Sequence, residues 1–146
     1  MRRRTVLLIT ANPQEVHLTQ WTFGQAGPYH TLRVVRDGEE ALAYLLRQGA
    51  YTAPHCAPPP DVIVLDLPLP RLSGQEVVQR LKQDPRFQRV PIIVLAPSGR
   101  AEDVSQAYAA GANAYLQKPV EMARFLDVMS QLRAFWLETV ELPPPL

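Results

Sequence analysis

The run Asp61-Val62-Ile63-Val64-Leu65-Asp66 sets the fold class of this chain. Its four central residues are all apolar, which is typical of a strand that is buried on both faces. A parallel sheet with helices on both sides buries a strand in this way. The proline run Pro58-Pro59-Pro60 excludes a helix just before the strand, so we expect a rigid loop to lead into it.

Similar apolar runs alternate with amphipathic segments along the rest of the chain. The expected strands are residues 6–9, 32–35, 62–66, 92–95 and 114–116. The expected helices are residues 13 to about 24, 40–47, 74–83, 101–110 and 122–137. Asn12 followed by Pro13 is typical of a helix start, and Gly111 of a helix end. This alternation predicts an α/β fold of the flavodoxin-like (βα)5 kind, with a doubly wound five-stranded parallel sheet in the order 2-1-3-4-5.

Length and composition indicate one globular domain, which we place at residues 1–137, followed by an extended proline-rich tail at residues 138–146. With 15 basic and 14 acidic residues, the chain has no strong field to attract nucleic acid or anionic lipid. The apolar run at residues 6–9 is too short for a membrane span. The single cysteine, Cys56, cannot form an internal disulfide. We therefore expect a cytoplasmic protein with neither nucleic-acid nor membrane partners.

Charged side chains follow two of the expected strands at their carboxyl ends, where open parallel sheets place their sites. Asp66 ends the third strand and Lys118 follows the fifth. Taken singly, Asp66 could be a helix cap and Lys118 a solvated surface residue. Together they favour a site, because an ammonium beside a carboxylate keeps it ionised and can neutralise a phosphoryl group on it.

Three segments resemble the receiver domains of response regulators, which are CheY-like: residues 35–42, 61–74 and 110–119. The resemblance runs from about Thr5 to Leu137. It implies that Asp66 is a phosphoacceptor, that Lys118 contacts the phosphoryl group, and that the Lys118–Pro119 bond is cis. It also implies that Tyr115 is a switch residue, although Tyr115 could instead be a half-buried aromatic of an edge strand.

The sequence departs from this family at four positions, one of which, Pro68, stands where the family has a polar residue but keeps its backbone carbonyl. Thr10 and Ala11 stand where the family has two adjacent acids, and Ala96 stands where it has Thr or Ser. Asp66 then remains the sole acid of the site. Because Mg²⁺ prefers carboxylate and water oxygens, we expect no metal site and no cofactor. Ala96 leaves room beside Tyr115, so we expect Tyr115 to rest inward; the hydroxyl of Thr10 or Ser98 could replace part of what Ala96 lacks.

Two functions remain open at this point. One is a pseudo-receiver, a two-component signalling protein that acts by protein–protein association with impaired or absent Mg²⁺-dependent phosphorylation. The alternative is a working phosphoacceptor that takes a phosphoryl group on Asp66 from a sensor histidine kinase. In neither case do we expect an enzyme or catalytic residues. A hydrolase or flavin protein lacks support, because the sequence has no nucleophile elbow and no glycine-rich phosphate loop.

The last helix and tail carry more apolar side chains than one helix face needs to cover a sheet. The candidate interface residues are Phe135, Trp136, Val140 and Leu142. The segment 135–143 resembles the tail of small regulators paired with bacterial phytochromes. This implies a homodimer whose tails reach over the partner, and a sensor kinase of the bacteriophytochrome type as a candidate partner. The alternative is a tail folded back on its own domain.

Overall fold

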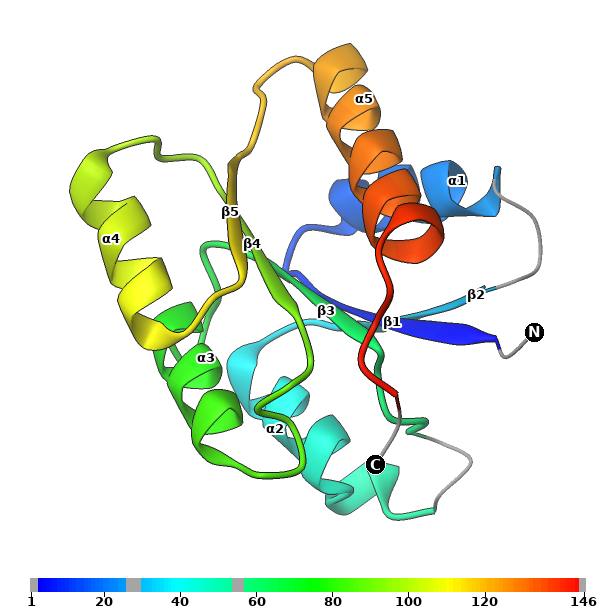
Figure 1. Ribbon diagram of the computed structural model, residues 1–146, viewed down its shortest axis with the longest axis vertical. Helices are drawn as coiled ribbons and strands as arrows, with labels where there is room; N and C mark the ends of the chain where they lie inside the picture. Colours follow the sequence, from blue (N-terminus) through cyan, green and yellow to red (C-terminus); the bar gives the residue numbers. More distant parts are fainter. Residues whose placement is uncertain (1–2, 26–29, 54–56, 145–146) are drawn as a thin grey trace.

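A parallel five-stranded sheet forms the centre of the computed structural model, which describes residues 3–25, 30–53 and 57–144 (Figure 1). Cys56, Pro145 and Leu146 lie outside the described residues. The strands are β1 (Arg4–Ile9), β2 (His30–Val35), β3 (Val62–Asp66), β4 (Ile92–Ala96) and β5 (Ala114–Gln117). Their order is β2-β1-β3-β4-β5, with every pairing parallel, which confirms the predicted fold. All five residues of β3 are buried, as its apolar sequence predicted.

The helices follow the strands in strict alternation. They are α1 (Pro13–Gly24), α2 (Gly38–Leu46), α3 (Gly74–Gln83), α4 (Ala101–Ala110) and α5 (Met122–Arg133). A short 3₁₀-helix, η1 (Gly49–Tyr51), comes after α2, and a π-helical turn, η3 (Ala134–Thr139), continues α5 two residues past the expected end. The chain leaves α2 through Arg47 in the left-handed conformation, and α2 begins two residues before the expected start at residue 40.

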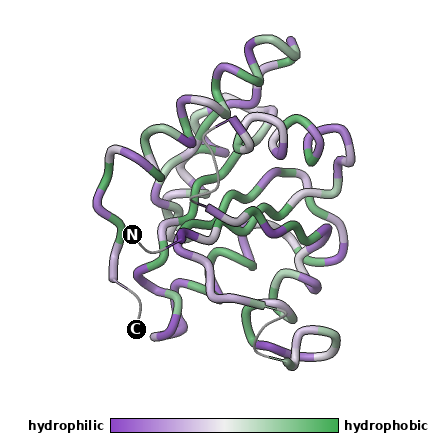
Figure 2. The backbone as a smooth tube through the Cα atoms, turned by 90° about the vertical axis from the view of Figure 1, so that its right-hand side faces the viewer, coloured by the Kyte–Doolittle hydropathy of each residue, from purple (hydrophilic) through white to green (hydrophobic). Residues whose placement is uncertain are grey.

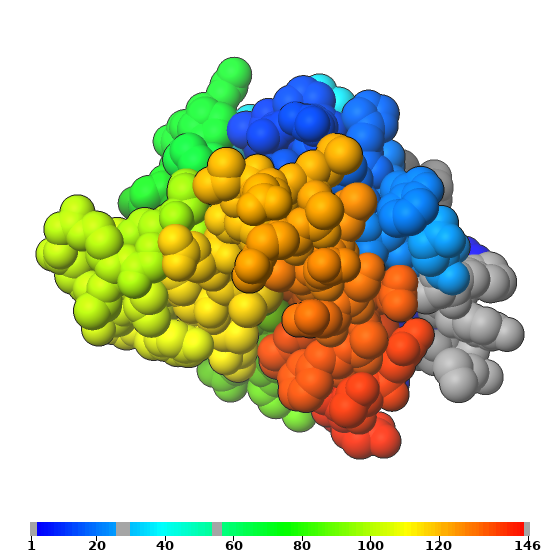
Figure 3. Space-filling view, turned by 90° about the horizontal axis from the view of Figure 1, so that it is seen from above, coloured from blue at the N-terminus to red at the C-terminus, as the bar shows by residue number. Residues whose placement is uncertain are grey.

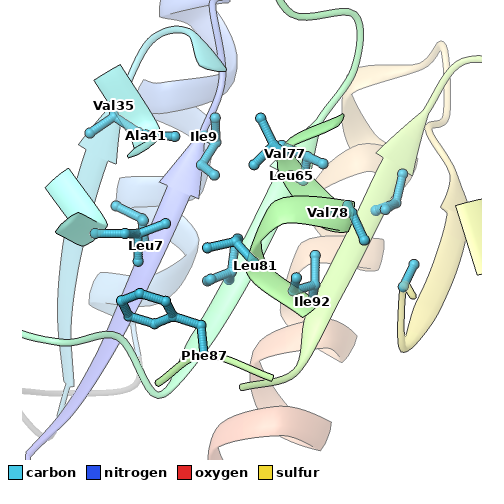
Figure 4. Close-up of a cluster of buried hydrophobic side chains, with 14 of the residues drawn as sticks. Leu7, Ile9, Val35, Ala41, Leu65, Val77, Val78, Leu81, Phe87 and Ile92 are labelled. Carbon is cyan, nitrogen blue, oxygen red and sulfur yellow. The ribbon is translucent and has the colours of Figure 1, made fainter. Parts of the chain in front are cut away.

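Two apolar layers cover the sheet because successive side chains of each strand point to opposite faces. In β1, Leu7 and Ile9 join a cluster under α2, α3 and α4, whereas Val6 and Leu8 join a cluster under α1 and α5. Figure 4 shows the first layer, with Leu7, Ile9 and Leu65 facing Leu81 of α3. Along the backbone, the hydrophobic residues concentrate on the central strands (Figure 2). This double layer holds the carboxyl ends of the strands rigidly side by side.

Local signals position the helices at that edge. Asn12 Oδ1 accepts hydrogen bonds from the backbone N–H of Gln14 and Glu15, at 3.0 and 3.4 Å, so α1 begins where Asn12-Pro13 predicted. Gly111 closes α4 with a φ of 120°, where a side chain would collide with Lys82. The helices α1 and α5 lie against each other, and Figure 3 shows them side by side from above in blue and orange.

The tail folds back on its own domain. After η3 it runs down past the sheet, in red in Figure 1, and Leu142 is only 8% exposed within the α1/α5 cluster. Trp136 and Val140 pack against the same cluster, while Phe135 is 52% exposed. The four residues expected at one interface therefore divide into three that cover this domain and one that faces outward. Within the described ranges, none of the helices combines the length and apolar character that a membrane span requires.

Candidate functional site

Asp66, the last residue of β3, is the centre of a cluster of polar side chains at the carboxyl edge of the sheet. It is only 3% exposed, and both of its oxygens have partners. Thr10 Oγ1 donates a hydrogen bond to Oδ2 at 2.6 Å, and Lys118 Nζ donates to Oδ1 at 2.7 Å. The expectation that Asp66 and Lys118 meet is confirmed by this contact. A buried carboxylate is tolerated only with such partners, since removing it from water is costly.

Lys118 is held in place by more than Asp66. Its backbone N–H donates to the Ala96 carbonyl at 2.7 Å, which fixes the chain after β5 against the end of β4. Its Nζ also lies 3.2 Å from the Leu67 carbonyl and 3.1 Å from Glu15 Oε1. Burial opposes the charge of Lys118, but the hydrogen bonds and negative charges of Asp66 and Glu15 outweigh it and raise the pKa of the ammonium.

Glu15 belongs to the site, although the sequence analysis did not place it there. The expectation that Asp66 is the sole acid is therefore wrong. Glu15 stands three residues after the helix cap Asn12, in the first turn of α1, and that turn lies over the end of β1. The cap at Asn12 is the available signal, because it places Glu15 in the first turn of a helix that follows β1. Burial first, and then the neighbouring Asp66 carboxylate, raise the pKa of Glu15 to about 7, against the opposing effect of Lys118.

The two positions that replace the acidic pair behave differently. Thr10 is buried, and its hydroxyl donates a hydrogen bond to Asp66 Oδ2. The same hydroxyl oxygen accepts a hydrogen bond from the backbone N–H of Asn12 at 3.1 Å. Ala11 is exposed and contributes no polar side-chain atom. The Ser98 hydroxyl bonds to Asp103 of α4 instead of reaching Asp66. Of the two hydroxyls that could have compensated for Ala96, Thr10 is the one that reaches Asp66.

Tyr115 lies on β5 with its ring partly buried against the α2/α3/α4 cluster. Its hydroxyl donates to the Ser98 carbonyl at 2.7 Å, and its backbone N–H donates to Tyr108 Oη at 3.2 Å. Ala96, at the end of β4, is 4% exposed. The Tyr115 ring thus occupies a half-buried position that is anchored to the β4–α4 loop.

The peptide bond after Lys118 differs from the expectation. Within the described residues the cis bond is Leu67–Pro68, directly after Asp66, and Lys118–Pro119 is trans. The expected cis bond at Lys118 is wrong. It was based on the resemblance alone, and the trans isomer is the intrinsically favoured one even before proline.

The donor set does not fit a resident magnesium ion. In the part of the chain that the structure describes, no three His, Cys, Asp or Glu side chains gather into a possible metal cluster. Mg²⁺ requires about six oxygens in near-octahedral geometry, whereas both oxygens of Asp66 are already bonded to Thr10 and Lys118. A cavity of about 580 Å³ lies elsewhere, between Leu46, Phe87 and Pro143. At the site itself, the carboxylate of Asp66 is bonded to side chains of this chain.

Comparison with known proteins agrees with this geometry. The model of the response regulator receiver domain matches residues 6–130. Response regulator Rcp1 of Synechocystis sp. is 35% identical over 140 residues, covering 96% of this chain and 93% of that protein. The crystal structure of the phosphorylated cyanobacterial phytochrome response regulator RcpA superposes with a TM-score of 0.91 at 33% identity, over 97% of this chain and 99% of that one.

A crystal structure of the Mn²⁺-bound form of Rcp1 superposes with a TM-score of 0.89 at 35% identity, over 97% of this chain and 99% of that one. The similarity thus extends over nearly the whole chain, including β1, β3 and β5, which carry the site. With this match in family, sequence and fold, the chain belongs to the response regulator receiver domains, and its relatives include phytochrome-associated regulators.

Proposed function

We propose that this protein is a pseudo-receiver: a non-enzymatic two-component signalling protein that transmits its signal by association with other proteins. Phosphoryl transfer to an aspartate brings two anions together, and a bound divalent cation makes this approach tolerable. The attacking carboxylate oxygen must also present a free lone pair to phosphorus. Both requirements concern the same side chain, Asp66.

One observation carries the proposal. Asp66 is 3% exposed, and its two oxygens are held by the Thr10 hydroxyl and the Lys118 ammonium. Each of these bonds withdraws electron density from the oxygen that would attack phosphorus, so both make Asp66 a weaker nucleophile. No cluster of metal ligands among the described residues would help the anionic phosphoryl donor to approach it.

The second candidate is a working phosphoacceptor. Its support is the Lys118 ammonium, which already contacts Asp66 at 2.7 Å and would neutralise a phosphoryl group there. The phosphorylated state of the similar protein RcpA gives further support. This candidate requires that Asp66 attack phosphorus through a lone pair that the bonds to Thr10 and Lys118 leave free.

Incubation with acetyl phosphate and magnesium, followed by intact-mass measurement, separates the two functions. We expect no rapid gain of a phosphoryl group by the wild type, with Asp66→Asn as the blank. A double variant, Thr10→Asp with Ala11→Asp, restores an acidic pair beside Asp66 and should be phosphorylated faster than the wild type. Rapid modification of the wild type that disappears in Asp66→Asn would overturn the pseudo-receiver.

We also propose a sensor histidine kinase of the phytochrome type as the partner. The support is the similarity to RcpA, a cyanobacterial phytochrome response regulator, over 97% of this chain. Titration calorimetry with the kinase core of a bacterial phytochrome should show saturable binding that Asp66→Asn leaves intact, since association does not need phosphorylation in a pseudo-receiver. The lack of any binding to such a kinase would contradict this partner.

Finally, we propose that the protein is a homodimer. Phe135 is a large aromatic residue that is 52% exposed, next to Trp136 at a ring-centroid distance of 5.4 Å. Large exposed aromatic residues of this kind are typical of interface anchors. The sedimentation coefficient of a Phe135→Glu variant tests the proposal.

A further inference from the structure

The cavity of about 580 Å³ lies at the amino edge of the sheet, on the opposite side of the molecule from Asp66. Its lining comes from the end of α2, the segment before β3, the loop between α3 and β4, and the tail. Figure 1 shows the tail running down to this edge, toward the end of α2. Small-molecule sites in proteins commonly have volumes of roughly 300–1,000 Å³, so the cavity is large enough to hold a ligand.

Much of the cavity wall is apolar and belongs to the core. Tyr44, Leu45 and Phe87 line the cavity and are at most 8% exposed, because they also pack in the cluster under α2, α3 and α4. Pro60 and Pro143 add rigid apolar surface from the segment before β3 and from the tail. A wall built from core side chains keeps its shape, and it can accept the apolar body of a ligand.

The charged lining of the cavity is mainly basic. The charged side chains among its described lining residues are Arg47, Arg86, Arg89 and Asp61. Arg86 is already paired, because its Nη2 and Nε contact the two carboxylate oxygens of Asp84 at 2.7 and 3.1 Å. Asp61 is buried, and its Oδ2 accepts a hydrogen bond from the backbone N–H of Thr5 at 2.8 Å.

Arg47 and Arg89 reach the cavity from different segments, the end of α2 and the loop before β4. In the part of the chain that the structure describes, neither guanidinium forms an ion pair with a carboxylate. The planar guanidinium group matches the two oxygens of a carboxylate with parallel N–H donors. The cavity therefore combines an apolar wall with two cations that can pair with an anion.

We propose that this cavity binds a small organic anion, a carboxylate with a flat apolar body. The carboxylate pairs with Arg47 and Arg89, while the body packs against Leu45 and Phe87. Pro143 makes the tail one wall of the site, so the bound ligand contacts the tail and the domain together. The proposal goes beyond the pseudo-receiver function, because it concerns the other edge of the sheet and requires no phosphorylation.

Two probes of the same shape test the proposal: 2-naphthoate, which is anionic, and 2-naphthamide, which is neutral. In calorimetric titrations of the full-length protein, 2-naphthoate should bind saturably and at least about tenfold more tightly than 2-naphthamide. The double variant Arg47→Gln with Arg89→Gln should bind 2-naphthoate about tenfold more weakly than the wild type. Its affinity for 2-naphthamide should not change, because the apolar wall is intact.

Arg80→Gln is the matched control for the arginine variant. Arg80 is an exposed arginine of α3 that pairs with Glu76 at 3.0 Å and does not line the cavity, so this variant should bind both probes as the wild type does. Pro143→Gly with Pro144→Gly loosens the wall that the tail provides and keeps Leu142. It should weaken the binding of both probes at least about threefold, because apolar contact area is lost. Circular dichroism checks that each variant is folded.

The absence of saturable 2-naphthoate binding at millimolar concentration would overturn the proposal. Equal affinities of the wild type for the two probes would do the same, as would an arginine variant that binds 2-naphthoate like the wild type. If the two proline replacements left both affinities unchanged, the tail would not be part of the site. The acetyl phosphate experiment is independent of these titrations, since it concerns Asp66 at the opposite edge of the sheet.

Discussion

The Thr10 hydroxyl donates a hydrogen bond of 2.6 Å to the buried carboxylate of Asp66. We expect Thr10→Val, which keeps the shape and removes the hydroxyl, to lower the free energy of unfolding by about 1.5–3 kcal/mol. The reason is that Asp66 Oδ2 and the backbone N–H of Asn12 both lose their bond to Thr10. Urea denaturation followed by fluorescence measures the change.

Thr10→Ser is the control for this prediction, because it keeps the hydroxyl and should lose much less stability. If Thr10→Val were as stable as the wild type, the hydrogen bond to Asp66 would contribute nothing to the fold. The support for the pseudo-receiver would then be weaker, since a bond without energetic value does not restrain Asp66.

Glu15 predicts a pH dependence of stability. Its pKa rises from 4.5 to about 7 on folding, so the folded state holds the proton more tightly than the unfolded state. Stability from this group is full below about pH 4.5 and is lost as the pH rises through about 7, by at most about 3 kcal/mol. Glu15→Gln should therefore flatten the fall in unfolding free energy between about pH 5 and pH 8 in urea titrations.

Glu141→Gln, which changes an exposed carboxylate of the tail, is the matched control for this pH dependence. If the unfolding free energies of the wild type and Glu15→Gln differed by the same amount at about pH 5 and pH 8, Glu15 would not cause the pH dependence.

At the residue scale, the sequence predicted the meeting of Asp66 and Lys118 because both follow apolar strands of one parallel sheet. It missed Glu15 because the helix pattern indicates a cap but not the direction in which a first-turn side chain bends.

At the scale of an element, the tail is the least expected part of the fold. Leu142 is 8% exposed in the α1/α5 cluster, so Leu142→Ala should lower the free energy of unfolding by about 2–4 kcal/mol through the cavity it leaves. Val120 is fully exposed before α5, and Val120→Ala should stay within about 0.5 kcal/mol of the wild type. Equal effects of the two substitutions in thermal or urea denaturation would show that the tail does not pack on the domain.

The helices illustrate which local signals are reliable. The expected ranges of α3 and α4 agree with the structure because serine or glycine marks an end and the apolar spacing is regular. The end of α2 lies one residue before the expected end, because Arg47 adopts the left-handed conformation that ends the helix. Arginine gives no sequence signal for that conformation, which closes with a hydrogen bond from the Gln48 N–H to the Ala43 carbonyl at 2.8 Å.

At the scale of the whole molecule, the homodimer proposal depends on Phe135. In sedimentation velocity, the wild type should sediment as a dimer and Phe135→Glu as a monomer, because a charge replaces the exposed ring at the proposed contact. Val120→Glu introduces the same charge at another fully exposed position and should leave the dimer intact. Removing the tail is a poor test, since it would also remove Leu142 from the core of its own domain.

A wild type that sediments as a monomer at all concentrations would contradict the homodimer. Leu142, Trp136 and Val140 pack on their own domain. The sequence alone did not decide whether these side chains cover their own domain or a partner. An apolar tail buries its side chains equally well on its own domain or on a partner, and hydropathy alone does not distinguish the two.

The sequence by itself determined the (βα)5 order, the buried central strand and the placement of Asp66 and Lys118 at one edge of the sheet. These follow from local patterns, apolar periodicity and helix caps, which operate within a few residues. Only the tertiary structure decided that Thr10 and Lys118 each donate a hydrogen bond to one oxygen of Asp66. It also decided that Glu15 forms an ion pair with Lys118 and that Leu142 packs in the core of its own domain. These contacts join residues up to 103 positions apart, and their geometry depends on how the layers pack rather than on any local pattern.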